Sequence, residues 1–436
     1  MPSTSVSPMA EAVGAIEGVN KAKPSKLGRD FWLYFSGQLT SQLGSSFTMF
    51  VLPLLVYRLT KSSMGLAYTT VAEFVPYLLF GLVLGALVDR LPRRQLMMAT
   101  DIARGLVLLA LPLLQLTGYL RVWEIYVVAF LQSSLGILFN CGEFAAIPSL
   151  VDQTNLVAAN GRIMATNSAG AVVGPALAGV LVPFISMSGL LITDACTFFL
   201  SALTLALIHR SFDAGKEGEG PQEKTTIRSD VKEGLAYVWA NPVLRSISIM
   251  MALVNFVGAT EGSQLVLYAK SVLHTGDVGT AMLFAAGAAG VVIVGLAAAP
   301  IRRQFSFVVC CLGTLVISGL AVSLMAVIGT FPAAMILWGV SAGFGLFLNI
   351  NTSTLRQTIV PARLYGRVIS VAGVVAWSAI PLGALAGAAA IRITGNVAGV
   401  YFVTGLLTAL IAIAFSFSPI RQGDRYMDEA NQRSET

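Results

Sequence analysis

The sequence predicts an all-α membrane protein whose twelve transmembrane helices form two pseudo-symmetric bundles of six. Composition gives the first support: 56% of the 436 residues are hydrophobic and only 11% are charged, whereas a soluble domain is about one-quarter charged. The second support comes from the apolar segments, whose length is roughly the 20 residues that a membrane-spanning helix needs. They recur six times on each side of one long hydrophilic interval. The 42 glycines suit helices that pack closely in a membrane.

The apolar segments follow one another with short polar interruptions, and each can cross the hydrocarbon as one helix. The first six are expected at residues 31–57, 65–88, 96–118, 122–148, 163–188 and 189–209. The second six are expected at residues 245–269, 277–300, 306–327, 331–354, 368–391 and 397–418.

The hydrophilic interval divides the chain. The stretch "SFDAGKEGEGPQEKTT" (211–226) is typical of a flexible linker. After it, Ile227, Val231, Leu235 and Val238 recur at a spacing that predicts a short amphipathic helix on the bilayer surface. We therefore expect a cytoplasmic N-terminal tail (1–30), a first bundle (31–210), a cytoplasmic linker with this helix (211–244), a second bundle (245–418) and a cytoplasmic C-terminal tail (419–436).

Short motifs recur between the two halves. "RRQ" occurs at 93–95 and 302–304, and "LAG" occurs at 177–179 and 385–387. "LVDQTNLVAANGRIMA", from residue 150, parallels "LRQTIVPARLYGRVIS", from residue 355. The similar offset of all three pairs, 205 to 209 residues, indicates a duplicated six-helix unit.

Lysine and arginine predict the orientation. With a cytoplasmic N-terminus, 22 of the 28 basic residues lie on the inner side and five lie in outer loops. Because cytoplasmic loops carry the excess of basic residues, we expect both termini in the cytoplasm of a multi-pass cell-membrane protein. The first apolar stretch is too long for a cleaved signal peptide.

The residues also argue against several other classes. The net charge of +6 is spread over loops without a basic stripe, so we expect no nucleic-acid partner. The four cysteines lie inside predicted spans without a CxxC spacing, which predicts neither a disulfide framework nor a metal site. No nucleophile–base constellation indicates an enzyme, and no GxxxxGK[ST] motif indicates direct use of ATP. We expect a monomer without a cofactor.

The stretch "GALVDRLPRRQLM" (85–97) resembles the signature loop between helices 2 and 3 of the major facilitator superfamily, of the form G-x-L-a-D-R-x-G-R-R. The matching residues are Gly85, Leu87, Asp89, Arg90, Arg93 and Arg94. Pro92 stands where that pattern has a glycine. The resemblance covers essentially the whole chain and implies a transporter fold.

A second stretch, "GAVVGPALAG" (170–179), resembles the helix-5 motif that this superfamily associates with antiporters. The matching residues are Gly170, Gly174, Pro175 and Gly179. The motif also has a structural role: its small residues allow tight helix packing, and its proline bends the helix. With "LPLLVYRLTKSSMGLA" and "AAIPSLV", the chain most resembles bacterial exporters of drugs and siderophores, such as macrolide and enterobactin exporters.

Asp89 lies at the C-terminal end of a predicted helix, where a carboxylate opposes the helix dipole. The resemblance implies that it faces the start of helix 11, near Gly366 and Arg367, as a latch that stabilises the outward-facing state. The neighbouring arginines could serve only to set topology, but topology does not explain the aspartate.

Ionisable residues inside a membrane are costly and tend to be functional. The candidates for proton and substrate sites are Glu261, Glu73, Glu143, Asp101, Arg104, Gln38, Gln42, Asn140 and Asn255. Glu261 and Glu73 have no obvious neighbouring cation, so either could carry a proton; a hydrated cavity glutamate without a coupling role is the alternative. Asp101 and Arg104 are expected to pair along one helix face or to join the signature loop.

The resemblance and the lack of an ATP motif suggest a secondary active transporter that exports an amphiphilic small molecule in exchange for protons. A basic substrate would compete with the proton for an ionised carboxylate. Two alternatives stay open. The chain could be an uptake symporter for a nutrient or lipid, or a membrane scaffold or sensor that transports nothing.

Overall fold

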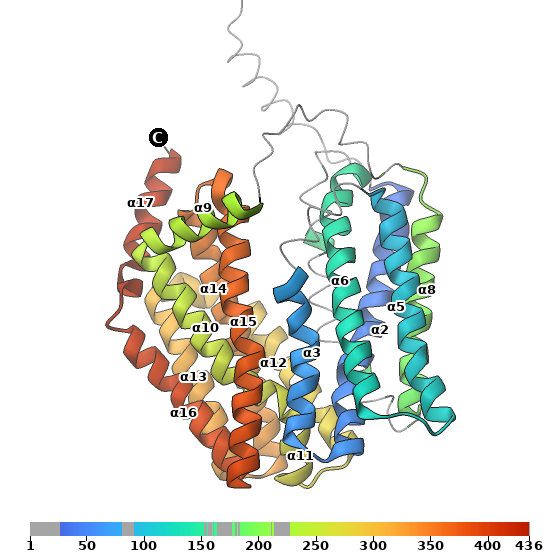
Figure 1. Ribbon diagram of the computed structural model, residues 1–436. Coiled ribbons are helices and arrows are strands. Elements are labelled where there is room, and N and C mark those ends of the chain that lie inside the picture. Colours follow the sequence, from blue (N-terminus) through green and yellow to red (C-terminus); the bar gives the residue numbers. More distant parts are fainter. Residues whose placement is uncertain are drawn as a thin grey trace, which may run out of the picture.

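The computed structural model describes residues 27–80, 91–151, 184–210 and 227–435, together with positions 155, 159, 161–163, 177–178, 181 and 212. All regular secondary structure in these residues is helical (Figure 1). Ten of the described helices are long and apolar enough to cross a membrane. The expectation of an all-α, multi-pass membrane protein is thereby confirmed.

The helices of the first half are α2 (Arg29–Thr60), α3 (Ser63–Phe80), α5 (Arg93–Leu116), α6 (Val122–Leu150) and α8 (Met187–Ala206). The second half contains α9 (Ile227–Ala240), α10 (Pro242–Ser263), α11 (Leu265–Ser271), α12 (Asp277–Gln304), α13 (Phe307–Ile328), α14 (Phe331–Ile359), α15 (Ala362–Thr394) and α16 (Val397–Phe415). A 3₁₀ turn, η3 (Pro419–Gln422), leads into α17 (Gly423–Glu435).

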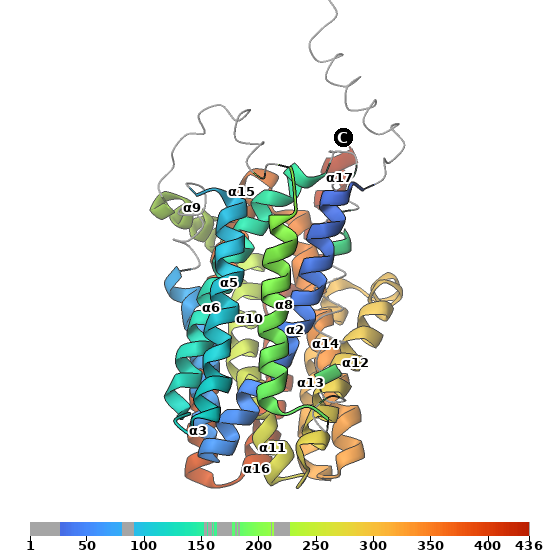
Figure 2. The ribbon, with the colours of Figure 1, turned by 90° about the vertical axis from the view of Figure 1, so that its right-hand side faces the viewer.

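Most contacts between helices stay within one half of the chain. In the first half, α8 packs against α2 and α5, and α6 packs against α5 and α3. In the second half, α10 packs against α15, α14 against α12 and α13, and α13 against α16. We call these sets the first and second groups. Helices α9 and α17 lie at one end of the molecule and α11 at the other (Figures 1 and 2), and we call these the α9 end and the α11 end.

Among the described helices, the two groups meet chiefly where α3 packs against α15. At this crossing Ala67 of α3 and Ala384 and Ala388 of α15 form a buried cluster. Small side chains let helix backbones approach closely, which is how helices associate where lipid removes the usual hydrophobic driving force.

Glycines serve the same purpose inside the second group. A Cβ atom at Gly290 of α12 would lie 1.8 Å from the carbonyl oxygen of Gly339 in α14. A Cβ atom at Gly383 of α15 would lie 1.8 Å from the carbonyl oxygen of Phe256 in α10. Neither crossing can accept a larger residue without moving a backbone.

The segment expected as one helix over 245–269 is divided in the structure. Helix α10 ends at Ser263 and α11 begins at Leu265. Between them Gln264 is fully buried, and its side-chain nitrogen donates to the backbone oxygen of Ser63 at 3.0 Å. Apolar periodicity cannot reveal this break, because the buried contact of Gln264 is with Ser63, a residue distant in the sequence.

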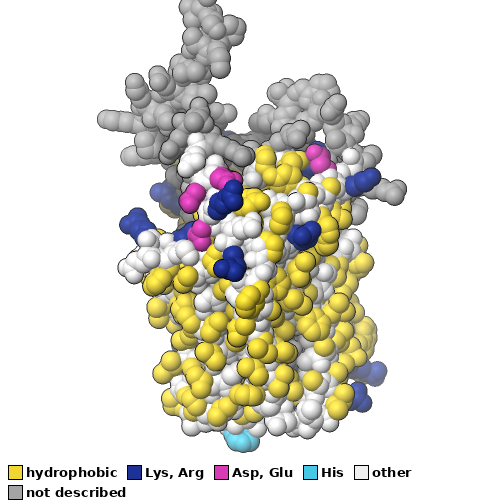
Figure 3. Space-filling model, turned by 90° about the vertical axis from the view of Figure 1, so that its left-hand side faces the viewer, with side chains coloured by type: hydrophobic (Ala, Val, Ile, Leu, Met, Phe, Trp, Pro, Cys, Tyr) yellow, Lys and Arg dark blue, Asp and Glu magenta, His cyan; other side chains and the backbone are white. Residues whose placement is uncertain are grey.

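The outer surface carries the pattern of a membrane protein. On the face shown in Figure 3, hydrophobic side chains form a broad band, and most acidic and basic side chains gather toward the α9 end. Helix α9 lies across that end (Figure 1), in the region where the sequence predicts an amphipathic helix. Its Val238 is buried and its Trp239 is half exposed.

We expect Gly290→Ala to destabilise the protein by about 1–3 kcal/mol, the usual cost of forcing extra volume into a packed contact. Gly313→Ala is the matched control, since a Cβ atom on that α13 glycine meets nothing within 4 Å. The control should be neutral or slightly stabilising, because alanine is the better helix former by about 1 kcal/mol. Thermal unfolding of both variants in detergent measures the difference, and equal melting temperatures would contradict the expectation.

Candidate functional site

A cavity of about 1290 Å³ lies between the two groups of helices. Its lining comes from α3 and α6 of the first group and from α10, α14 and α15 of the second. The residues that α14 and α15 contribute lie in the half of each helix nearer the α9 end. The cavity is larger than the roughly 300–1000 Å³ of typical small-molecule pockets, so it can hold a sizeable ligand together with water.

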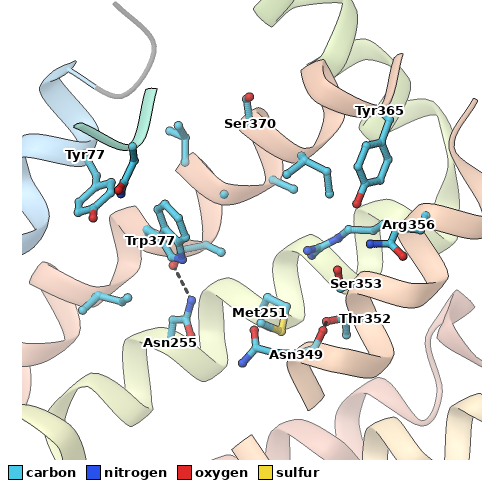
Figure 4. Close-up of a pocket in the computed structure, with 18 of the residues that line it drawn as sticks. Tyr77, Met251, Asn255, Asn349, Thr352, Ser353, Arg356, Tyr365, Ser370 and Trp377 are labelled. Carbon is cyan, nitrogen blue, oxygen red and sulfur yellow. Dashed lines mark hydrogen bonds between the residues drawn. The ribbon is translucent and has the colours of Figure 1, made fainter. Parts of the chain in front are cut away.

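Aromatic side chains bridge the two groups at this cavity. The ring of Tyr77, from α3, meets the ring of Trp377, from α15, edge to face, with centroids 5.3 Å apart and an interplanar angle of 76°. Both line the cavity (Figure 4). They offer flat apolar surface, and Met251 extends it from α10.

The polar side chains of the cavity are mostly engaged within the protein. The Asn255 side-chain nitrogen donates to the Ala376 carbonyl at 2.9 Å, and that of Asn349 donates to the Gly345 carbonyl at 3.0 Å. The Thr352 hydroxyl donates to the Leu348 carbonyl at 2.9 Å. Arg356 differs, because its Nη2 atom is buried without a hydrogen-bond partner in the described residues. Its side chain extends from α14 beside Tyr365 and Ser353 (Figure 4).

Contacts that join the two groups concentrate on the α11 side of the cavity. Asp277, at the start of α12, pairs with Arg58 at the end of α2 and accepts from Lys270 of α11 at 2.6 Å. The Ser63 hydroxyl donates to the Ala388 carbonyl at 3.0 Å. The described residues therefore close the α11 side with ion pairs and hydrogen bonds as well as with the α3–α15 crossing.

Several of the predicted site residues form one buried network inside the first group. Tyr34 of α2 donates its hydroxyl proton to Glu143 of α6. One turn along α2, the Gln38 nitrogen donates to the Ser201 hydroxyl of α8 at 3.1 Å. Asp101 of α5 is 1% exposed, and both of its carboxylate oxygens are buried near Ser201 and Glu143 without a hydrogen-bond partner in the described residues. Four helices thus bring two acids together away from the cavity.

Arg104 continues this network toward the α11 end. Its Nε atom donates to the Gln132 side-chain oxygen at 3.2 Å, and Gln132 donates back to the Arg104 carbonyl at 2.7 Å. The guanidinium lies 4.1 Å from the ring centroid of Phe198. It forms no ion pair with Asp101 in the structure, so the local pairing expected from their spacing is replaced by an amide and an aromatic partner.

Asp194 of α8 is also buried, with 1% of its surface exposed. It accepts hydrogen bonds from the hydroxyls of Thr48 and Thr197. Of the other candidates, the backbone oxygen of Glu73 accepts from Ser133 at 2.6 Å, and that of Gln42 accepts from Ser46 at 2.9 Å. Neither side chain lines the central cavity, whereas those of Asn140 and Asn255 do.

Glu261 lies between α10 and α16 rather than among the cavity residues. It is 8% exposed, and one of its carboxylate oxygens has no hydrogen-bond partner in the described part of the chain. Thr404 is its side-chain neighbour, and the Tyr401 hydroxyl donates to its backbone oxygen at 2.7 Å. A buried carboxylate with so few partners is costly to charge where it stands.

The two recognised motifs fall largely outside the described residues, which exclude Gly85, Asp89, Arg90, Gly170, Gly174, Pro175 and Gly179. The end of the first motif is described. Arg94 donates from Nε to the Leu205 carbonyl at 2.9 Å and from a second nitrogen to the Ala206 carbonyl. Arg93 donates to the Phe212 carbonyl at 3.2 Å. These arginines therefore satisfy carbonyls at and just beyond the C-terminus of α8, where positive charge is favoured.

The predicted partner region of the latch starts earlier than expected. Helix α15 begins at Ala362, so Gly366 and Arg367 lie inside it. Gly366 is exposed, and Arg367 forms an ion pair with Glu233 of α9. A Cβ atom at Gly234 would lie 2.7 Å from the Arg367 carbonyl oxygen, so α9 packs directly on α15.

Comparison with known proteins fits this arrangement of helices around a central cavity. The model of the Major Facilitator Superfamily matches residues 34–384. The chain belongs to this superfamily. It is accordingly a transporter and not an enzyme, as the sequence indicates.

The curated relatives of this superfamily member include exporters. It is 26% identical over 358 residues to "Multidrug efflux pump Tap" of Mycolicibacterium fortuitum, covering 79% of this chain and 85% of that one. It is 23% identical over 361 residues to "Macrolide efflux protein A" of Streptococcus pyogenes, covering 81% and 87%. Among solved structures, an inward-facing bacterial homologue of the human lysosomal transporter Spinster matches with a TM-score of 0.67 and 15% identity, over 94% of this chain and 98% of that one. At 15% identity, this match supports a shared fold only.

Sequence reasoning missed Arg356, Tyr365 and Trp377 as cavity residues. A signal for Arg356 was present, since Asn349, Thr352, Ser353 and Arg356 recur at helical spacing on one face. Its place in the last turn of its helix, next to the expected cytoplasmic surface, instead suggests a basic residue that only sets the membrane orientation.

We expect Asp277→Asn to loosen the closure of the α11 side by removing the charge that holds Arg58 and Lys270. With the four cysteines replaced by alanine, Ser63→Cys places a thiol at a position that is 7% exposed, and its labelling by a polar thiol reagent reports opening. Labelling should become a few-fold faster, because partly exposed ion pairs contribute about 0.2–1 kcal/mol each.

The control is Asp424→Asn, which removes a carboxylate 3.7 Å from Arg302 at the opposite end of the molecule. This change should leave the labelling rate at position 63 unaltered. Equal rates in the Asp277 and Asp424 variants would show that the ion pairs do not hold the α11 side closed.

Proposed function

We propose that this transporter exports an amphiphilic small molecule in exchange for protons, by alternating access of the central cavity to the two sides of the cell membrane. One observation carries the proposal: the cavity lies between two groups of helices that are joined mainly on its α11 side. Rocking of the groups about a central site is how such folds move a substrate. The drug-exporting relatives support the direction.

We further propose twelve membrane spans in two six-helix halves, 31–210 and 245–418. Ten spans are described. The eleventh is α3, whose described part is 18 residues long and whose predicted span continues to residue 88. The twelfth is the apolar segment at 163–188, most of which lies outside the described residues. The α9 end would face the cytoplasm with both termini, as the distribution of basic residues supports.

For coupling, the best supported carriers are acids that the protein buries without a strong cationic partner. Glu261 meets this condition between α10 and α16, and Glu73 is the alternative in α3. If opening of the transporter exposes such a carboxylate to water, its proton affinity changes with the conformational state. Protonation and substrate would then bias the same equilibrium.

We expect Glu261→Gln to abolish proton-driven export while leaving ligand binding intact. The assay uses inverted vesicles, an imposed pH gradient and fluorescent amphiphiles of positive, zero and negative charge. Glu429→Gln, a change on partly exposed α17, is the control and should export normally. Survival of coupling in Glu261→Gln but not in Glu73→Gln would assign the proton to Glu73.

Survival of coupling in both glutamate variants would contradict proton transfer at either site. A wild-type protein that exports none of the amphiphiles would contradict the export function itself. Gradient-driven uptake in the direction of the cytoplasm would identify a symporter instead.

We expect Asp89→Asn to reduce transport several-fold without reducing membrane insertion, if the carboxylate acts as the latch between the halves. The outward-facing state would lose a charge-assisted contact of about 1.5–3 kcal/mol. Transport rate and the amount of folded protein are measured in the same vesicles, with Asp428→Asn on α17 as the control. Undiminished transport would leave the signature loop with a purely topological role.

A further inference from the structure

The charged group of the central cavity is an arginine. Among the described residues that line the cavity, Arg356 is basic and none is acidic. The acids of the first group, Asp101 and Glu143, belong to the buried network around Tyr34 and Ser201, and Glu261 faces α16. The cavity as described is therefore electropositive, although the protein buries several carboxylates nearby.

Arg356 lacks the ion pair and hydrogen bonds that usually surround a charged residue with a purely structural role. It forms no ion pair with a described residue, and its Nη2 atom is buried without a hydrogen-bond partner. A buried guanidinium nitrogen without an acceptor costs free energy. Two hydroxyls of its own helix within four residues of it, those of Thr352 and Thr354, donate to carbonyls of that helix at 2.9 Å each. The protein thus leaves a donor without a described partner in the central cavity.

Setting topology does not explain this geometry. An arginine in the last turn of a spanning helix can extend into water, and its charge then costs little. Arg356 instead lines the cavity with Tyr365 beside it (Figure 4). Guanidinium groups bind carboxylates, sulfonates and phosphates through paired hydrogen bonds, so an anion in the cavity would satisfy this donor.

The opposite part of the cavity supplies the complementary surface. Trp377 and Tyr77 form an aromatic wall, and Met251 and Ile380 add aliphatic surface. Asn140 and Asn255 place amide groups beside this wall. A ligand that spans the cavity therefore contacts the cation Arg356 at one side and the apolar wall of Trp377 and Tyr77 at the other.

We propose that the cavity binds amphiphilic anions, with the acidic group on Arg356 and the apolar body against Trp377 and Tyr77. The inference rests on the proposed function only in taking this cavity as the place where the transported molecule binds. It makes basic compounds poor ligands, in contrast to the competition between a basic substrate and a proton that the sequence suggests.

Three fluorescent probes with one aromatic group test the charge requirement: dansylglycine is an anion, its amide is neutral and dansylcadaverine is a cation. Binding to the full-length protein in phosphatidylcholine nanodiscs is measured by equilibrium dialysis. The wild type should bind dansylglycine about tenfold more tightly than the amide, as expected for a charge-assisted hydrogen bond of about 1.4 kcal/mol, and dansylcadaverine least tightly.

Arg356→Gln should remove the preference for the anion and leave the affinity for the neutral amide within about twofold. Arg356→Lys should restore part of it, because lysine keeps the charge but loses the planar pair of donors. Arg392→Gln is the matched control, since that exposed arginine lies at the other end of α15, and it should behave as the wild type.

Equal affinity of the wild type for the anion and the amide would overturn the proposal, as would a preference that survives in Arg356→Gln or no binding of any probe. If phosphatidylglycerol in the nanodisc displaces dansylglycine from the wild type, the natural anion is a lipid headgroup; if it does not, the anion is a free solute. Arg356-dependent binding without export in vesicles would keep this inference and reject the export function.

Discussion

Packing of α3 against α15 holds the two groups of helices together, and the rest of the structure depends on it. Alanines on both helices bring the backbones close, and the hydrogen bonds of Ser63 and Gln264 with their neighbours add polar contacts beside the crossing. Farther along the same two helices, Tyr77 and Trp377 still touch across the boundary, and there the cavity begins. One crossing therefore sets both the closure of the α11 side and the shape of the site.

The protein separates its buried charges by location. In the first group, Glu143 and Asp194 accept hydrogen bonds from hydroxyls of α2 and α8, whereas both carboxylate oxygens of Asp101 are buried without a hydrogen-bond partner in the described residues. The second group instead directs a cation with an unsatisfied nitrogen into the cavity. Under the proposed coupling at Glu261 or Glu73, the proton carrier does not line the cavity, whereas Arg356 does. Such a division would let coupling and selectivity be altered by different mutations.

The sequence predicted the fold class well because spanning helices need long apolar runs, and these survive any detail of packing. From four apolar residues at helical spacing it predicted a helix after the hydrophilic stretch, where α9 lies, and it identified Asn140 and Asn255, which line the cavity. It could not predict the break at Gln264 or the burial of Asp194, because both depend on partners from distant helices: the Ser63 carbonyl in one case and Thr48 in the other. The role of Arg356 was hidden for a related reason. An arginine near a helix end has the same pattern whether it extends into water or into a cavity.

The attachment of α9 has a mechanical consequence. Phe212 is buried against the first group, where its carbonyl accepts from Arg93 and Ser149, whereas Glu233 and Gly234 fix α9 to α15. Between 212 and 227 the chain has a contour length of up to about 50 Å, comparable with the full thickness of a bilayer. A contour of that length does not by itself fix the distance between the two groups, and α9 is attached to the second group through its own contacts with α15. Among the described residues, non-covalent contacts between α3 and α15 therefore decide how firmly the two groups are joined.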